Sequence, residues 1–174
     1  MRHYLMELVG AFFLTFALVT TGNPIAVGLM FMAMYYIGER VSGGYYNPAL
    51  AVAGWVRGVL SVEDMLIYSG VETVGAFLAV WLYRSLFNIV YMPEQVADNG
   101  LLMACLVQGL LAAVFASVFL TCATSKDYKG SVVNGVVIGL TLSSLLFISE
   151  LFNPAIAAGS YLGALLAGDG SGRP

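Results

Sequence analysis

Two copies of the tripeptide Asn-Pro-Ala, at residues 47–49 and 153–155, constrain the fold of this chain more than any other feature. Both copies lie in apolar sequence, where proline removes a backbone donor and asparagine carries an amide that hydrocarbon cannot satisfy. Such a pair persists at membrane depth only where the broken backbone is buried in protein or lines a water-filled cavity. The repeated motif therefore predicts a duplicated membrane protein with a site between its two halves.

The composition is that of a membrane protein. Hydrophobic residues make up 60% of the 174 residues and charged residues only 10%, whereas a soluble domain carries about 25% charged residues. The formal net charge is −3. Because no basic patch is present, we expect no nucleic-acid partner. The charged residues cluster at the ends of apolar runs, so we expect the partner of this surface to be the lipid bilayer.

Five apolar runs are long enough, or nearly so, to cross a bilayer as helices of about 20 residues. Two shorter stretches, 47–57 and 153–167, begin at the two Asn-Pro-Ala copies and suit re-entrant half-helices, because they are too short to span. In both, asparagine would be the N-cap and proline would lie in the first turn. The five runs are residues 4–20, 24–39, 62–86, 100–122 and 132–150.

This order predicts an all-α membrane protein built from two repeats. The first repeat, 1–86, holds three spans and one half-helix, and the polar loop 87–99 connects it to the second repeat, 100–167. Three spans in the first repeat would invert the second repeat in the membrane. After the second half-helix only the polar tail 168–174 remains, so a sixth span is missing. A fragment, or a chain that has lost its end, is an open alternative.

The positive charges predict a cytoplasmic N-terminus for this multi-pass protein. With that orientation, five basic residues lie inside and two lie outside, in agreement with the positive-inside rule. The inner residues are Arg2, Arg40, Arg57, Lys126 and Lys129, and the outer ones are Arg84 and Arg173.

Three segments resemble the aquaporin, or major intrinsic protein, family. Residues 42–50, Ser-Gly-Gly-Tyr-Tyr-Asn-Pro-Ala-Leu, resemble the first pore loop of the family, and residues 152–155 resemble the second. Residues 6–14 resemble the opening of the first span. The resemblance covers nearly the whole chain in order. It implies an aquaporin-like inverted repeat, a passive channel and not an enzyme, a homotetramer, and neither a cofactor nor a metal ion.

The resemblance also implies that the two motifs meet at the bilayer midplane. There the two half-helix N-termini, each carrying roughly half a positive charge, would repel cations and hydronium. The asparagine amides would donate hydrogen bonds to a passing oxygen atom. The residues expected at this midplane site are Asn47, Pro48, Ala49, Asn153, Pro154 and Ala155.

At the outer constriction the chain departs from the family pattern. Ile156 stands where the family usually has an arginine, and the other expected contributors are Val27, Thr141 and Glu150. These side chains predict a wider and more apolar constriction than that of a strict water filter. The expected solutes are water together with small neutral molecules such as glycerol, urea, ammonia or a dissolved gas.

Glu7 and Gln108 are the expected supports of the pore loops. Glu7 is an ionisable residue within a span, which by default indicates a function. The resemblance implies that its carboxylate accepts hydrogen bonds from the loop backbone, although a glutamate so near the helix start could instead reach the interface. Gln108 lies where the family often has a second glutamate. It could support a loop without charge or pair with a neighbouring helix.

A second class of function stays open alongside the channel. The missing span would leave a gap in the pore wall, which favours a non-conducting membrane protein that acts in assembly or interaction. The chain has no cluster of His, Cys, Asp or Glu with metal-ligand spacing and no nucleophile with a nearby base. An enzyme is therefore not expected.

Overall fold

The computed structural model describes residues 1–93, 100–149, 152–166 and 168, and this part of the chain is all-helical. Residues 94–99 of the loop 87–99 and all of the tail 168–174 except residue 168 therefore lie outside the described residues. The helices are α1 (Arg2–Thr21), α2 (Pro24–Ser42), α3 (Pro48–Val56), α4 (Val62–Phe87), α5 (Gly100–Thr124), α6 (Asn134–Leu146) and α7 (Pro154–Leu166).

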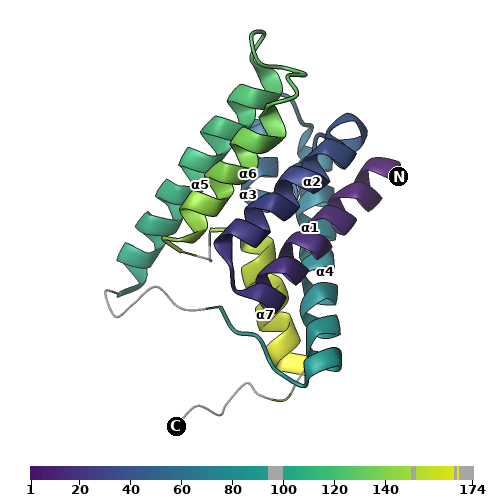
Figure 1. Cartoon of the computed structure of the whole chain (residues 1–174), viewed down its shortest axis with the longest axis vertical. Coiled ribbons are helices and arrows are strands. Elements are labelled where there is room, and N and C mark those ends of the chain that lie inside the picture. Colours follow the sequence, from purple (N-terminus) through teal and green to yellow (C-terminus); the bar gives the residue numbers. More distant parts are fainter. Residues whose placement is uncertain (94–99, 150–151, 167, 169–174) are drawn as a thin grey trace.

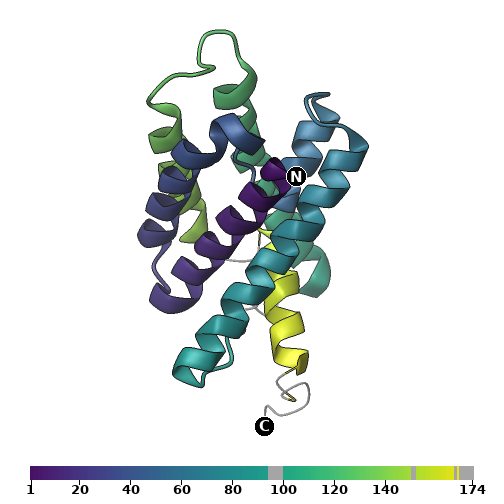
Figure 2. The same ribbon diagram turned by 90° about the vertical axis from the view of Figure 1, so that its right-hand side faces the viewer.

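The long helices form a bundle, and the two helices that follow the Asn-Pro-Ala motifs both pack against α4 (Figures 1 and 2). α1 packs against α2 and α4, and α2 packs against α6, which also contacts α5. The short helix α3 touches α4, α5 and α7, while α7 packs along α4. In Figure 1, α3 lies in the upper half of the bundle and α7 runs from its centre toward the lower end. The starts of α3 and α7 therefore lie near the middle of the molecule.

Three of the described helices, α1, α4 and α5, are each long and apolar enough to cross a membrane. The boundaries of α1, α2, α4 and α5 agree with the predicted runs to within a few residues. The predicted run 132–150 differs, because α6 has only 13 residues. At 1.5 Å per residue it is about 20 Å long, which is shorter than the bilayer core of about 30 Å.

Polar side chains lie at both ends of α6. At its start, the Asn134 amide donates to the carbonyl oxygens of Cys122 (3.0 Å) and Tyr128 (2.9 Å), which fixes the preceding loop against the end of α5. Near its end, the Ser143 and Ser144 hydroxyls bond back to carbonyl oxygens four residues earlier, at 3.1 and 2.9 Å. Such back-bonding also occurs within the longer helices α4 and α5, so the contacts of Asn134 are what distinguish α6. These contacts cannot be predicted from hydropathy.

Close helix crossings depend on glycines that have no room for a side chain. A Cβ on Gly75 of α4 would overlap the carbonyl oxygen of Leu8 in α1. In the same way, a Cβ on Gly28 of α2 would overlap the carbonyl oxygen of Gly139 in α6. Gly70, one and a half turns before Gly75, has no atom within 4 Å of such a Cβ. The α1–α4 crossing therefore requires glycine at position 75 and not at position 70.

We expect Gly75→Ala to lower stability by about 1–3 kcal/mol, the usual cost of an overpacked contact. The backbone oxygen of Leu8 cannot turn away as a side chain would. Gly70→Ala is the matched control, and it should be neutral or slightly stabilising because alanine is the better helix former. Thermal unfolding of the two variants in the same detergent tests this. Equal unfolding temperatures would contradict the importance of the close crossing.

Candidate pore site between the two half-helices

Each Asn-Pro-Ala motif begins a short helix in the same way. Asn47 has an extended backbone, with φ −156° and ψ 119°, and its side-chain oxygen accepts a hydrogen bond of 2.9 Å from the Ala49 N–H. The side-chain oxygen of Asn153 accepts one of 3.0 Å from the Ala155 N–H. Asparagine is thus an N-cap in both motifs, and the following proline occupies the first turn, where its missing N–H costs nothing.

The two motifs are in contact across the centre of the molecule. The Asn153 Nδ2 atom donates to the carbonyl oxygen of Tyr46, the residue before Asn47, at 3.4 Å. Both asparagines are buried, and α3 contacts α7. Two positive helix ends and two amides therefore lie in one small buried region. Such a region favours electronegative atoms of neutral groups and disfavours cations.

Glu7 of α1 accepts hydrogen bonds from the loop that leads to Asn47. Its two carboxylate oxygens accept from the backbone N–H groups of Tyr45 at 3.1 Å and Tyr46 at 2.6 Å. Glu7 is fully buried. Because a buried backbone N–H without a partner is costly, this carboxylate lets an irregular loop lie inside the bundle.

Tyr46 adopts a backbone conformation that is unusual for its residue type. Its φ of 53° lies in the left-handed region, which is uncommon for a bulky side chain. Three contacts hold it there. Its N–H bonds to Glu7, its hydroxyl donates to the Met34 carbonyl oxygen at 2.8 Å, and its ring fills a slot where a Cβ on Gly10 or Gly38 would collide with it.

Glu72 of α4 is a buried acidic residue that the sequence analysis missed. It is fully buried, and its carboxyl group lies beside that of Glu7 and the backbone of Asn47. In the described part of the chain, no donor group hydrogen-bonds to its oxygens. The sequence contained the signal that could have identified Glu72, an ionisable residue within the apolar run 62–86. The same reasoning identified Glu7.

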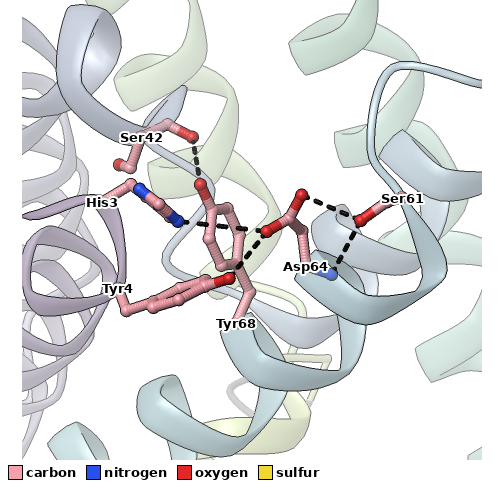
Figure 3. Close-up of polar contacts among 6 residues, drawn as sticks. All are labelled: His3, Tyr4, Ser42, Ser61, Asp64 and Tyr68. Carbon is pink, nitrogen blue, oxygen red and sulfur yellow. Dashed lines mark hydrogen bonds and ion pairs between the residues drawn. The ribbon is translucent and has the colours of Figure 1, made fainter. Parts of the chain in front are cut away.

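A second polar cluster ties α4 to the ends of α1 and α2 (Figure 3). Asp64, at the start of α4, accepts hydrogen bonds from the hydroxyls of Tyr4 (2.9 Å) and Ser61 (2.8 Å). One turn further on, the Tyr68 hydroxyl donates to the carbonyl oxygen of Ser42 at 2.9 Å. Ser42 is the last residue of α2. The cluster thus fixes the end of α2 from which the loop to Asn47 departs.

The structure describes three of the four residues predicted for the outer constriction. Val27 of α2 and Ile156 in the first turn of α7 are both buried in the same apolar cluster. Thr141 of α6 is half-buried, and its hydroxyl donates to the Val137 carbonyl oxygen at 2.8 Å. Glu150 lies outside the described residues. The constriction therefore stays a prediction.

Gln108 of α5 contacts the segment that precedes the second half-helix. Its Nε2 atom donates to the Ser149 hydroxyl at 2.7 Å, four residues before Asn153. Its Oε1 atom is buried and accepts no hydrogen bond from the described residues. Gln108 therefore bonds to the approach of the second loop, whereas Glu7 bonds directly to the backbone of the first.

The fold and this site define a polytopic helical protein in which two asparagine-capped half-helices meet inside the bundle. The sequence profile of the major intrinsic protein family matches residues 13–164. The chain belongs to the major intrinsic protein family, as the sequence analysis predicted.

Relatives of known type are similar to much of the chain. The glycerol uptake facilitator protein-like 6 of Lactiplantibacillus plantarum is 28% identical over 165 residues, which cover 86% of this chain and 76% of the relative. Aquaporin TIP4-2 of Zea mays is 29% identical over 155 residues, or 83% of this chain and 58% of that protein. The chain thus spans little more than half the length of some relatives.

A solved structure has the same fold. The aquaglyceroporin from Plasmodium falciparum superposes with a TM-score of 0.80 and 17% sequence identity, over 95% of this chain and 81% of that one. The all-α, aquaporin-like fold predicted from the sequence is therefore confirmed. Members of the family are integral, multi-pass membrane channels and not enzymes, which agrees with the sequence analysis and supports a channel for water or small solutes.

Replacing Glu7 by leucine should destabilise the protein by about 1–3 kcal/mol for each buried N–H group that loses its acceptor. The backbone N–H groups of Tyr45 and Tyr46 would be left without their acceptor. Glu63→Gln, a change at an exposed residue in the first turn of α4, is the control and should alter stability little. Hydrogen exchange at residues 45 and 46 reports the loss directly. Unchanged protection in the Glu7 variant would contradict the supporting contact.

Proposed function

We propose that this protein is a passive transmembrane channel for water and small neutral solutes. The observation that carries the proposal is the contact between the two motifs, in which the Asn153 amide reaches the Tyr46 carbonyl oxygen beside Asn47. The contact brings two capped helix starts, one from each half of the chain, to one place. In a chain of the major intrinsic protein family, such a place is where solutes would cross.

The same geometry favours the exclusion of ions. The N-termini of α3 and α7 both contribute partial positive charge to the site, which opposes the entry of cations. The asparagine side-chain oxygens accept from the Ala49 and Ala155 N–H groups, which leaves the amide NH₂ groups as the donors of the site. That of Asn153 also donates to the Tyr46 carbonyl oxygen. A water molecule that accepts hydrogen bonds there would be oriented so that it cannot relay a proton.

The apolar residues near the start of α7 favour solutes beyond water. Ile156, in the first turn of α7, and Val27 of α2 are buried aliphatic side chains, and neither one hydrogen-bonds a solute. Small neutral molecules that expose carbon atoms, such as glycerol and urea, can contact these aliphatic side chains at little cost in free energy. The similarity to a protein named as a glycerol uptake facilitator supports the same solute class.

One observation favours the second candidate function, a non-conducting protein that acts in assembly. Only 1% of the surface of Asn47 and 6% of that of Asn153 is accessible. In this conformation water hardly touches either residue. Flux measurements separate the two functions, because an assembly protein would show no flux in any state.

The charge distribution supports an N-terminus on the cytoplasmic side. The N-terminus and the α5–α6 loop, which carries Lys126 and Lys129, lie at the same end of the bundle in Figures 1 and 2. We propose this orientation on the positive-inside rule. We also propose that the protein forms a homotetramer in the bilayer, because members of the family usually do.

Asn153→Leu should abolish solute flux, because the leucine removes the amide donor and fills the space beside Tyr46. The measurement is stopped-flow light scattering of proteoliposomes under osmotic gradients of sucrose, glycerol and urea. Asn23→Leu is a matched control, since Asn23 also precedes a proline and also caps a helix, accepting from the Ile25 N–H at 2.9 Å. Asn23 is exposed at the surface. Its replacement should therefore lower stability only by the loss of one helix N-cap, about 1 kcal/mol, and should leave flux unchanged.

Flux that persists in the Asn153 variant would place the solute path elsewhere. If flux disappears in both Asn153→Leu and Asn23→Leu, the effect is due to the loss of a helix cap and not to a role of Asn153 in the solute path. If the native protein does not accelerate any solute over protein-free vesicles, the channel proposal fails.

A further inference from the structure

A row of four aromatic rings connects the two Asn-Pro-Ala motifs through the centre of the bundle. Its ends are Tyr46 and Phe152, the residues directly before Asn47 and Asn153. Between them lie Phe31 of α2 and Phe115 of α5. The ring centroids are 5.7 Å apart for Tyr46–Phe31, 5.5 Å for Phe31–Phe115 and 6.0 Å for Phe115–Phe152, all in edge-to-face contact.

The aromatic row, defined as Tyr46, Phe31, Phe115 and Phe152, leaves little space at its position. Phe31, Phe115 and Tyr46 are completely buried, and Phe152 nearly so. The residues at the two ends of the row directly precede Asn47 and Asn153 in the chain. The buried rings therefore fill space next to both motifs.

A second set of rings lies one helical turn away on the same two helices. Tyr35 follows Phe31 on α2 and Phe119 follows Phe115 on α5, and their ring centroids are 6.1 Å apart. The Tyr45 ring lies 5.0 Å from that of Phe119. The blocked stretch is therefore two layers deep and extends along the facing surfaces of α2 and α5.

A buried hydroxyl lies in this second layer. Tyr35 is fully buried, and its hydroxyl makes no hydrogen bond within the described residues. The space beside this second pair of rings is therefore not wholly apolar.

We propose that Phe31 and Phe115 set the size limit of the channel at its midplane, by closing the space between the two asparagines. This inference rests on the proposed function. Edge-to-face ring contacts are individually weak, so a small shift between α2 and α5 separates the Phe31 and Phe115 rings. The resulting gap is narrow and admits water more readily than wider solutes such as glycerol.

The test is the permeability ratio of glycerol to water in proteoliposomes that contain native protein or Phe115→Ala. Loss of the ring should raise glycerol permeability several-fold and raise water permeability less, so that the ratio increases. Phe13→Ala is the matched control, because Phe13 of α1 is 40% exposed on the outside of the bundle. Its ratio should equal that of the native protein. Phe115→Leu, which keeps most of the buried volume, should give an intermediate ratio and serves if the alanine variant does not fold.

Each outcome separates this inference from the proposed function. If the native protein conducts and the Phe115 variants keep its glycerol-to-water ratio, the size limit lies elsewhere and the inference fails alone. If only the Phe115 variants conduct, the aromatic row is the barrier and the native protein is a closed channel. If neither conducts, the aromatic row is not what blocks flux, and both the inference and the proposed function are wrong.

Discussion

The two hydrogen bonds that Glu7 accepts from Tyr45 and Tyr46 determine much of the rest of the site. The loop before α3 is irregular backbone inside an apolar bundle, and its N–H groups need an acceptor that neither lipid nor a neighbouring helix backbone provides. The carboxylate provides it and holds Tyr46 in place. The Tyr46 carbonyl oxygen is in turn the acceptor for Asn153. One side chain of α1 thus influences the position of the second motif as well as the first.

The two loops are supported by groups of different charge. The first loop has a carboxylate, and a second carboxyl group, Glu72, lies beside it. Among the described residues, the neutral amide of Gln108 bonds to Ser149 on the approach to the second loop. The two buried carboxyl groups of Glu7 and Glu72 lie near the start of α3, where they oppose its partial positive charge.

Hydropathy and capping chemistry were enough to predict most of the helices and both half-helix starts. Apolar length predicts a span, and Asn-Pro predicts where a helix begins, because both depend on nearby residues. The length of α6 was not predictable in this way, since Asn134 ends the preceding loop through carbonyl oxygens 6 and 12 residues earlier in the chain. The contacts of the aromatic row could not be predicted from the sequence either. Phe31 and Phe115 are ordinary apolar residues until the fold brings α2 and α5 together.

The slot that holds Tyr46 makes the first loop part of the contact between α1 and α2. The Tyr46 ring lies against Gly10 of α1, and its hydroxyl lies against Gly38 of α2 and donates to the Met34 carbonyl oxygen. A larger residue at position 10 or 38 would therefore displace the loop as well as the helix crossing. The glycines that allow two helices to pack around one tyrosine thus also determine where the first half-helix starts.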